Sequence, residues 1–174
     1  CASRIAGAAS DQSGIPAGGW QSVLTDTRGP FTAMILQSAG TPATCLTGPS
    51  FTTITANATQ GGASQHVSSV SSATAGRPDV SMLGVDGSSA GPISQASQVQ
   101  LTASGQPYTF VQGQVQAGVT GATLVLSDGS DVQATVADGS FVAWWPGSAH
   151  STAAHVTSGS AVTTQPLTFT PLPE

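Results

Sequence analysis

Short apolar or alternating runs, each ended by Gly, Pro, Asp or Ser, recur along the chain. Runs of this kind, rich in Val, Ile, Thr and Phe and separated by turn residues, are typical of β-strands. Only residues 1–10 favour a helical conformation, and then for a single short turn. The pattern predicts strands at residues 20–25, 31–37, 43–47, 51–55, 66–70, 80–85, 98–102, 108–115, 122–127, 132–136, 141–145, 155–157 and 162–164.

The last third of the chain carries the clearest pattern. Asp128-Gly129 and Asp138-Gly139 each stand between two apolar runs, and Asp-Gly between such runs is a strong hairpin signal. Turns about ten residues apart indicate an antiparallel meander, which we expect over residues 106–165. The sequence therefore predicts an all-β fold, an antiparallel β-sandwich with many short strands and hairpins.

We expect one domain over residues 1–174, because a chain of this length can bury a sizeable core. A soft boundary is expected near residue 105, where Gly105 and Gln106 interrupt the pattern. Asp26 to Pro30 is read as a turn, and residues 57–78 as a mainly polar stretch containing an edge strand at 66–70.

Charge is scarce: 6% of residues are charged, there are three basic side chains and the formal net charge is −5. Neutralising a nucleic-acid backbone requires a Lys or Arg for each phosphate, so nucleic-acid binding is not expected. A polybasic attachment to anionic lipid is excluded on the same ground. No apolar run has the 18 or so residues of a membrane span, so we expect no direct membrane insertion by this segment.

Cys1 and Cys45 leave three possibilities open. They form a disulfide, or Cys1 is a lipoprotein cysteine while Cys45 is buried and free, or they are two unrelated thiols. The disulfide is favoured, since closing a loop of this length stabilises a fold by about 4 kcal/mol in the chain-entropy model. It implies an oxidising, extracytoplasmic compartment. Because the chain starts at Cys1 and not at Met, we expect a processed or trimmed form, either secreted or anchored to the cell surface.

Motifs for catalysis and metal binding are weak. The closest approach to a nucleophile elbow, residues 62–66, lacks the second Gly. The sole glutamate is Glu174, so paired carboxylates for glycoside hydrolysis are not expected. His150 and His155 would point to opposite faces of one strand. Asp128 and its neighbour Asp131 are read as turn residues, since Asp stabilises turns through its own side chain. We expect no catalytic residues, no metal and no cofactor.

Aromatic residues are the remaining candidates for binding. In a strand, the adjacent Trp144 and Trp145 point to opposite faces. One indole is then expected in the core, while the other meets a second layer or solvent. Either both are packed in a central strand, or one stacks on a ligand or docks a partner. Trp20 carries the same two alternatives.

The stretch YTFVQGQVQAGVTGATLVLSDGSDVQATVADGSFVAWWPG, residues 108–147, resembles a segment of an uncharacterised family of secreted or membrane-tethered proteins of high-GC Gram-positive bacteria. ATCLTGPSF, residues 43–51, is similar to the same group. The C-terminal part also resembles, more loosely, transthyretin-like or carboxypeptidase-regulatory β-sandwich domains. These resemblances imply architecture and location, and they bring no catalytic residues.

The sequence thus favours a non-catalytic extracytoplasmic interaction or sensing module, whose partner is an unknown protein or envelope component. A structural domain of an envelope protein is the alternative. A hydrolase with a site dispersed over loops, in which a Ser or Asp contacts His66, His150 or His155, is the third hypothesis.

Overall fold

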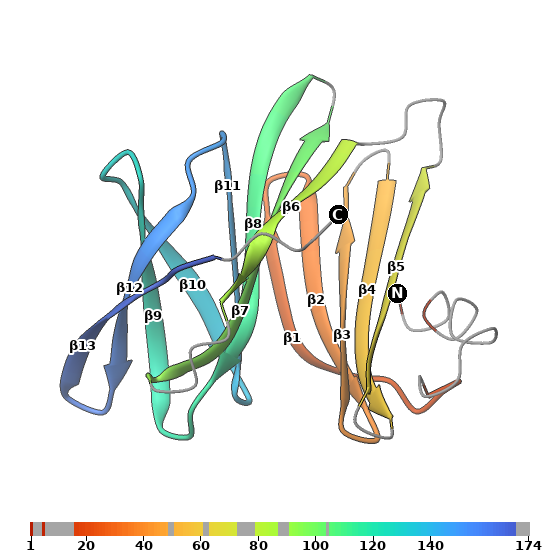
Figure 1. Ribbon diagram of the computed structural model, residues 1–174, viewed down its shortest axis with the longest axis horizontal. Coiled ribbons are helices and arrows are strands. Elements are labelled where there is room, and N and C mark those ends of the chain that lie inside the picture. The colour runs from red at the N-terminus through yellow and green to blue at the C-terminus, as the bar shows by residue number, and fades with distance from the viewer. Residues whose placement is uncertain are drawn as a thin grey trace. The chain divides into compact units, whose positions relative to one another are not determined.

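The computed structural model resolves the chain into two compact units, Cys1–Arg77 and Pro78–Glu174. Each unit contains one antiparallel sheet (Figure 1). The soft boundary expected near residue 105 falls between two paired strands of the second unit. Whether both units belong to the one domain expected stays a prediction. The structure describes residues 1, 5, 16–48, 51–60, 63–72, 79–86, 91–103 and 105–169.

Five strands in sequential order, β1 to β5, form the sheet of the first unit. Residues Ile35 and Leu36 of β2 are both buried, 5% and 2% exposed, and they point to opposite faces. The predicted burial of this strand on both faces is therefore confirmed. The strands are β1 (Gln21–Arg28), β2 (Phe31–Ser38), β3 (Thr41–Thr47), β4 (Phe51–Gln60) and β5 (Ala63–Ser72).

Two predicted boundaries in this sheet were wrong. The turn expected from Asp26 begins only after Arg28, because residues 26–28 pair with residues 31–33 of β2. Arg28 Nε lies 2.8 Å from Asp26 Oδ2, so a basic and an acidic side chain form an ion pair along one face of the strand. The second error concerns the ends of β4 and β5, which were predicted at residues 51–55 and 66–70. Both strands extend further into the polar stretch that begins at residue 57, because β4 and β5 pair without interruption from 51↔72 to 60↔63. Thr- and Ser-rich strands lack the apolar alternation by which a strand is recognised. The predicted edge position of β5 is confirmed.

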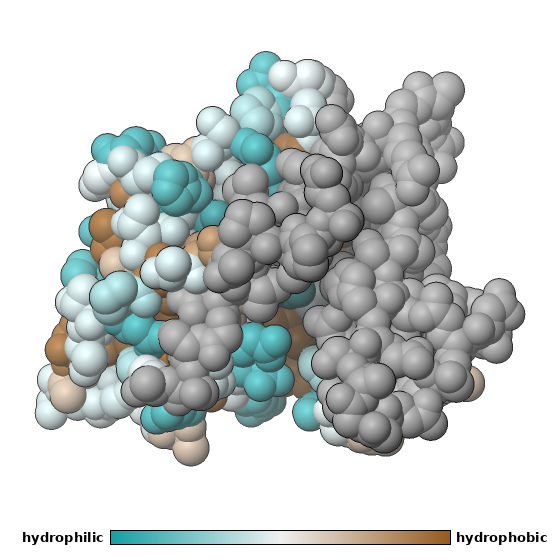
Figure 2. All heavy atoms as spheres, in the orientation of Figure 1, coloured by the Kyte–Doolittle hydropathy of each residue, from teal (hydrophilic) through white to brown (hydrophobic). Residues whose placement is uncertain are grey.

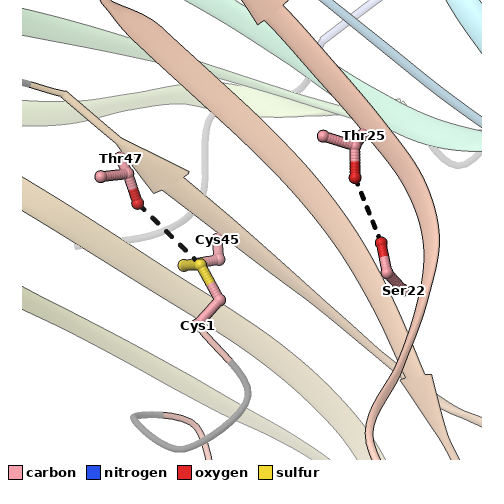
Figure 3. Close-up of a disulfide and its surroundings, with 5 residues drawn as sticks. All are labelled: Cys1, Ser22, Thr25, Cys45 and Thr47. Carbon is pink, nitrogen blue, oxygen red and sulfur yellow. Dashed lines mark hydrogen bonds between the residues drawn. A yellow bond between two sulfur atoms is a disulfide. The ribbon is translucent and has the colours of Figure 1, made fainter.

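A disulfide joins Cys1 to Cys45 of β3 (Figure 3). This confirms the first of the three possibilities for the cysteines. Around it, Ile5, Leu36 and Ala43 form a small buried cluster, against which Trp20 and Met34 pack. Ile5 N donates a hydrogen bond to Cys1 O at 3.0 Å, which closes one turn of the kind expected near the N-terminus.

The sheet of the second unit has the order β13-β12-β9-β10-β11-β8-β7-β6 and curls into a half-barrel (Figure 1). The curl occurs at β10, whose first half, residues 131–134, pairs with β9 while residues 135–137 pair with β11. Its strands are β6 (Asp79–Asp86), β7 (Ile93–Ala103), β8 (Gln106–Val115), β9 (Val119–Leu126), β10 (Asp131–Ala137), β11 (Ser140–Pro146), β12 (Ser151–Ser158) and β13 (Ala161–Pro166).

Residues from both halves of the curled sheet meet in one buried core. Phe141 and Trp145 of β11 lie in the same cluster as Leu124 of β9 and Val156 of β12. The predicted hairpins are also confirmed: Gly129 and Gly139 have φ values of 85° and 74°, which the two Asp-Gly turns require. In the described residues all the assigned elements are antiparallel strands, which confirms the predicted all-β class.

Two buried glutamines connect the halves of this sheet. Gln98 Oε1 of β7 accepts hydrogen bonds from Ser151 N and Ser151 Oγ of β12, at 2.9 and 2.8 Å. Gln165 of β13 binds Ile93 of β7 twice: Oε1 accepts from Ile93 N at 2.8 Å, and Nε2 donates to Ile93 O at 2.9 Å. The Gln165 amide thereby imitates the backbone of a neighbouring strand.

Candidate functional site

The tryptophan pair lies on β11, where it pairs with β8 in the middle of the curled sheet. Trp144 is opposite Phe110 and Trp145 is opposite Thr109. Because neighbouring residues of a strand point to opposite faces, the two indoles diverge. The prediction that only one of them enters the core is confirmed.

Trp145 is the tryptophan inside the core, where it is 5% exposed. Its Nε1 donates a hydrogen bond to Ala149 O at 2.9 Å, so the indole also holds the segment that follows β11. Thr109 supports the same segment, with Oγ1 donating to Gly147 O at 2.9 Å. For Trp145 the structure agrees with the packed alternative.

Trp20 also lies against a core. It is half-buried beside the Cys1–Cys45 cluster, and its Nε1 donates to Pro16 O at 3.0 Å. Both polar and apolar parts of this side chain therefore contribute to packing in the first unit. Its role in ligand binding stays a prediction.

Trp144 lies on the other face of β11, where it is half-buried. The Tyr108 ring on β8 meets it edge to face, with ring centroids 6.0 Å apart and an interplanar angle of 63°. Such a geometry is favourable for two aromatic rings and fixes the orientation of both. The two rings are held by paired strands, so little conformational freedom would be lost when a ligand contacts them.

The face of the sheet that carries Trp144 and Tyr108 also carries a polar residue, Gln112, which was not singled out from the sequence. Gln112 lies on β8 four residues after Tyr108, so the two side chains point to the same side. Its Oε1 is buried and accepts no hydrogen bond from the described residues. The period-two spacing of residues 108, 110 and 112 is the feature of the sequence that could have placed Gln112 on the same face as Tyr108. We call Tyr108, Gln112 and Trp144 the aromatic–amide site.

Apolar residues surround the site on its own strands. Phe110 and Val142, which are 4% and 0% exposed, lie on the same face of β8 and β11. Charged side chains are absent from residues 106–115 and 140–146, which form these strands. The site therefore offers aromatic faces and a hydrogen-bond acceptor in surroundings without formal charge.

The histidines and aspartates occupy other parts of the second unit. His155 of β12 places Nδ1 2.9 Å from Thr164 Oγ1 of β13, whereas His150 lies just before β12 and not on it. The two histidines therefore do not share a strand, and the comparison of opposite faces on a single strand does not apply to them. Asp128 Oδ1 accepts hydrogen bonds from Ser130 N and Oγ, which confirms its interpretation as a turn residue. His66 lies on β5, and its side chain is outside the described residues.

Among the described residues, no group of three or more His, Cys, Asp and Glu side chains is arranged to hold a metal ion. Within the same parts of the chain, no helix has both the length and the apolar character needed to cross a membrane. On the face shown in Figure 2, hydrophilic and weakly polar residues cover most of the described surface, and hydrophobic residues show between them. No protein-family model, curated protein or solved structure matches the chain.

Proposed function

We propose that the chain is a non-catalytic, extracytoplasmic interaction module that binds a protein or envelope component through the aromatic–amide site. The observation that carries this proposal is the partly exposed Tyr108–Trp144 ring pair with the Gln112 acceptor on the same strands. The Cys1–Cys45 disulfide supports an oxidising compartment, since such bonds persist outside the cytoplasm.

The chemistry of the site favours an uncharged partner. Trp and Tyr give a large contact area with few rotatable bonds, and they dominate binding energy at many interfaces. With few charges on the chain, steering by long-range electrostatics is weak, and recognition rests on stacking and hydrogen bonding. A buried amide oxygen gains most when a ligand brings a donor, because an unsatisfied buried acceptor costs about 1–3 kcal/mol.

Thermal unfolding in the presence of neutral sugars, cell-wall fragments and small metabolites tests the proposal. A ligand at a hundred times its dissociation constant stabilises the folded state by about 2.7 kcal/mol. For a chain of this size we expect a rise in Tm of roughly 2–4 °C for each kcal/mol. A protein partner would leave this panel flat, and is tested by cross-linking at the cell surface through a photoreactive group at Tyr108.

Two variants connect a response to the site. Trp144→Ala and Gln112→Leu are expected to abolish the ligand-induced shift or the cross-link. Gln112→Leu removes an unsatisfied acceptor and should leave the unliganded Tm unchanged or raise it, which a purely structural glutamine would not do. Gln116→Leu makes the same substitution at an exposed glutamine just after β8, outside the site, and is the control that should retain the response. A flat panel and no cross-link would contradict the proposal and favour the structural domain.

A further inference from the structure

The outer edge of β13 differs from the other edge strand with described side chains. At β1, a register shift occurs between Ser22 and Leu24, and the charged pair Asp26 and Arg28 follows. Bulges and charges on an edge strand prevent pairing with another chain. β13 pairs with β12 without a register shift, and residues 161–166 include no charged side chain.

The exposed side chains of β13 also favour pairing. Val162 is 66% exposed, and no other large hydrophobic side chain in the described part of the chain is classed as exposed. Thr163 and Thr164 are exposed beside it. β-branched residues are those that sheets accept most readily.

Hydrogen bonds show which backbone groups of β13 face outward. Leu167 N donates to Thr152 O at 2.9 Å, so residues 152 and 167 form a hydrogen-bonded pair. Such pairs alternate along an antiparallel ladder, and therefore residues 161, 163 and 165 direct their backbone groups to β12. Val162 and Thr164 direct theirs to the opposite edge, where no described strand pairs with β13, whereas Pro166 has no N–H to offer.

We infer that β13 pairs antiparallel with β13 of a second copy of this chain, about a two-fold axis at Thr163. Val162 then faces Thr164 of the second copy, and Thr164 faces its Val162. Both are pairs whose backbone groups point outward, so the two strands exchange four N–H···O=C bonds. A two-fold axis sets identical sequences against each other, and the uncharged edge avoids the like-charge repulsion that this would otherwise produce.

The contact is small, because Pro166 and the turn after β12 limit it to a few residues. Interfaces well below the usual size of stable complexes are weak. We therefore expect the dimer to dissociate on dilution and to be populated at high protein concentration. Sedimentation equilibrium should give a weight-average mass that rises above 17.1 kDa as concentration increases.

Three variants separate edge pairing from other association. Thr164→Pro removes an outward N–H without removing a backbone bond to β12, although it also removes the side-chain bond between Thr164 Oγ1 and His155 Nδ1. Val162→Lys leaves that bond in place and adds the charge by which natural edges are protected. Both should remain monomeric at concentrations where the unmodified chain associates. Gln114→Lys adds the same charge at an exposed side chain of the doubly paired strand β8 and should associate normally.

Hydrogen exchange of the unmodified chain gives a second measurement that needs no variant. The amides of Val162 and Thr164 should gain protection as concentration rises, while that of Thr163 is already bonded to β12. A constant monomer mass over the whole range would overturn the inference. Association that persists in both edge variants, or protection gained elsewhere than at Val162 and Thr164, would overturn it as well.

Discussion

Asp128 is the residue whose ionisation the structure ties most directly to a turn. The Ser130 hydroxyl and then the Ser130 N–H donate to its carboxylate, and these bonds lower the pKa of Asp128 below 3.8. A carboxyl group with a lowered pKa stabilises the fold above its unfolded pKa, and this contribution is lost as pH falls through the folded pKa. The loss therefore occurs in acid, below the ordinary titration range of an aspartate.

An NMR titration of the Asp128 carboxyl carbon tests this directly. We expect a pKa below 3.8 in the unmodified chain and a rise towards the ordinary value in Ser130→Ala, since the hydroxyl is the largest cause. Ser127→Ala removes a hydroxyl from the same turn that accepts from His150 N, so it should leave the Asp128 pKa unchanged. An identical pKa in Ser130→Ala would show that the hydroxyl bond is unimportant in solution.

Residue roles were predictable where a short-range rule governs them. The Asp-Gly turns followed from local conformational preference, and the divergence of Trp144 and Trp145 followed from strand geometry. Which indole enters the core was not predictable, because it depends on the face of β8 that bears Val111 and Gly113. The role of Gln112 could not be seen either, since burial of its amide results from the pairing of distant strands.

Two glycines in strands of the curled sheet differ in the space around them. A Cβ on Gly113 of β8 would overlap Gln95 O, lie 2.6 Å from the Phe141 ring and lie 2.9 Å from Ala96 Cα. A Cβ on Gly121 of β9 would have Thr157 as its nearest neighbour, at 3.7 Å. The first glycine permits close packing of β7 and β11 around β8, whereas the second leaves room for a methyl group.

Alanine at these positions should therefore have opposite effects. We expect Gly113→Ala to lower the free energy of unfolding by about 1–3 kcal/mol, the usual cost of overpacking. Gly121→Ala should be neutral or stabilising by up to about 1 kcal/mol, because it reduces the entropy of the unfolded chain. Urea unfolding of both variants measures the difference, and equal effects would contradict the packing described around Gly113.

At the scale of elements, the sequence predicted where strands occur better than where they end. Alternating runs located β8 to β11, whereas β4 and β5 extend far beyond their apolar residues. Those extensions are specified by pairing along a whole hairpin, from 51↔72 to 60↔63, and not by side-chain pattern. The change of partner along β10, from β9 to β11, is likewise a property of strand pairing and not of its own side-chain pattern.

At the scale of the molecule, the disulfide connects the first residue to the middle strand of its sheet. The bond spans a sequence separation of 44 and belongs wholly to the first unit. The sequence did not predict a division at residue 77, because that position lies inside the mainly polar stretch 57–78, which was read as a single region.

Removing the disulfide should destabilise the first unit selectively. For a loop of this length, Cys1→Ser with Cys45→Ser should cost about 4 kcal/mol in the chain-entropy model. Hydrogen exchange should report faster opening of β2 and β3, with β8 to β12 much less affected. Adding reductant should reproduce the effect in the unmodified chain and do nothing further in the double variant. Equal acceleration in both units would contradict a local role.

The bond between Gln165 and Ile93 has a consequence for the order in which the chain is delivered. A chain that leaves a ribosome or an export channel from its N-terminus presents β7 long before β13. Ile93 must then wait for a partner 72 residues further along the sequence. During that interval the N–H and C=O of Ile93 can form hydrogen bonds with other extended segments. Slow delivery of the last part of the chain would therefore favour incorrect pairing of β7.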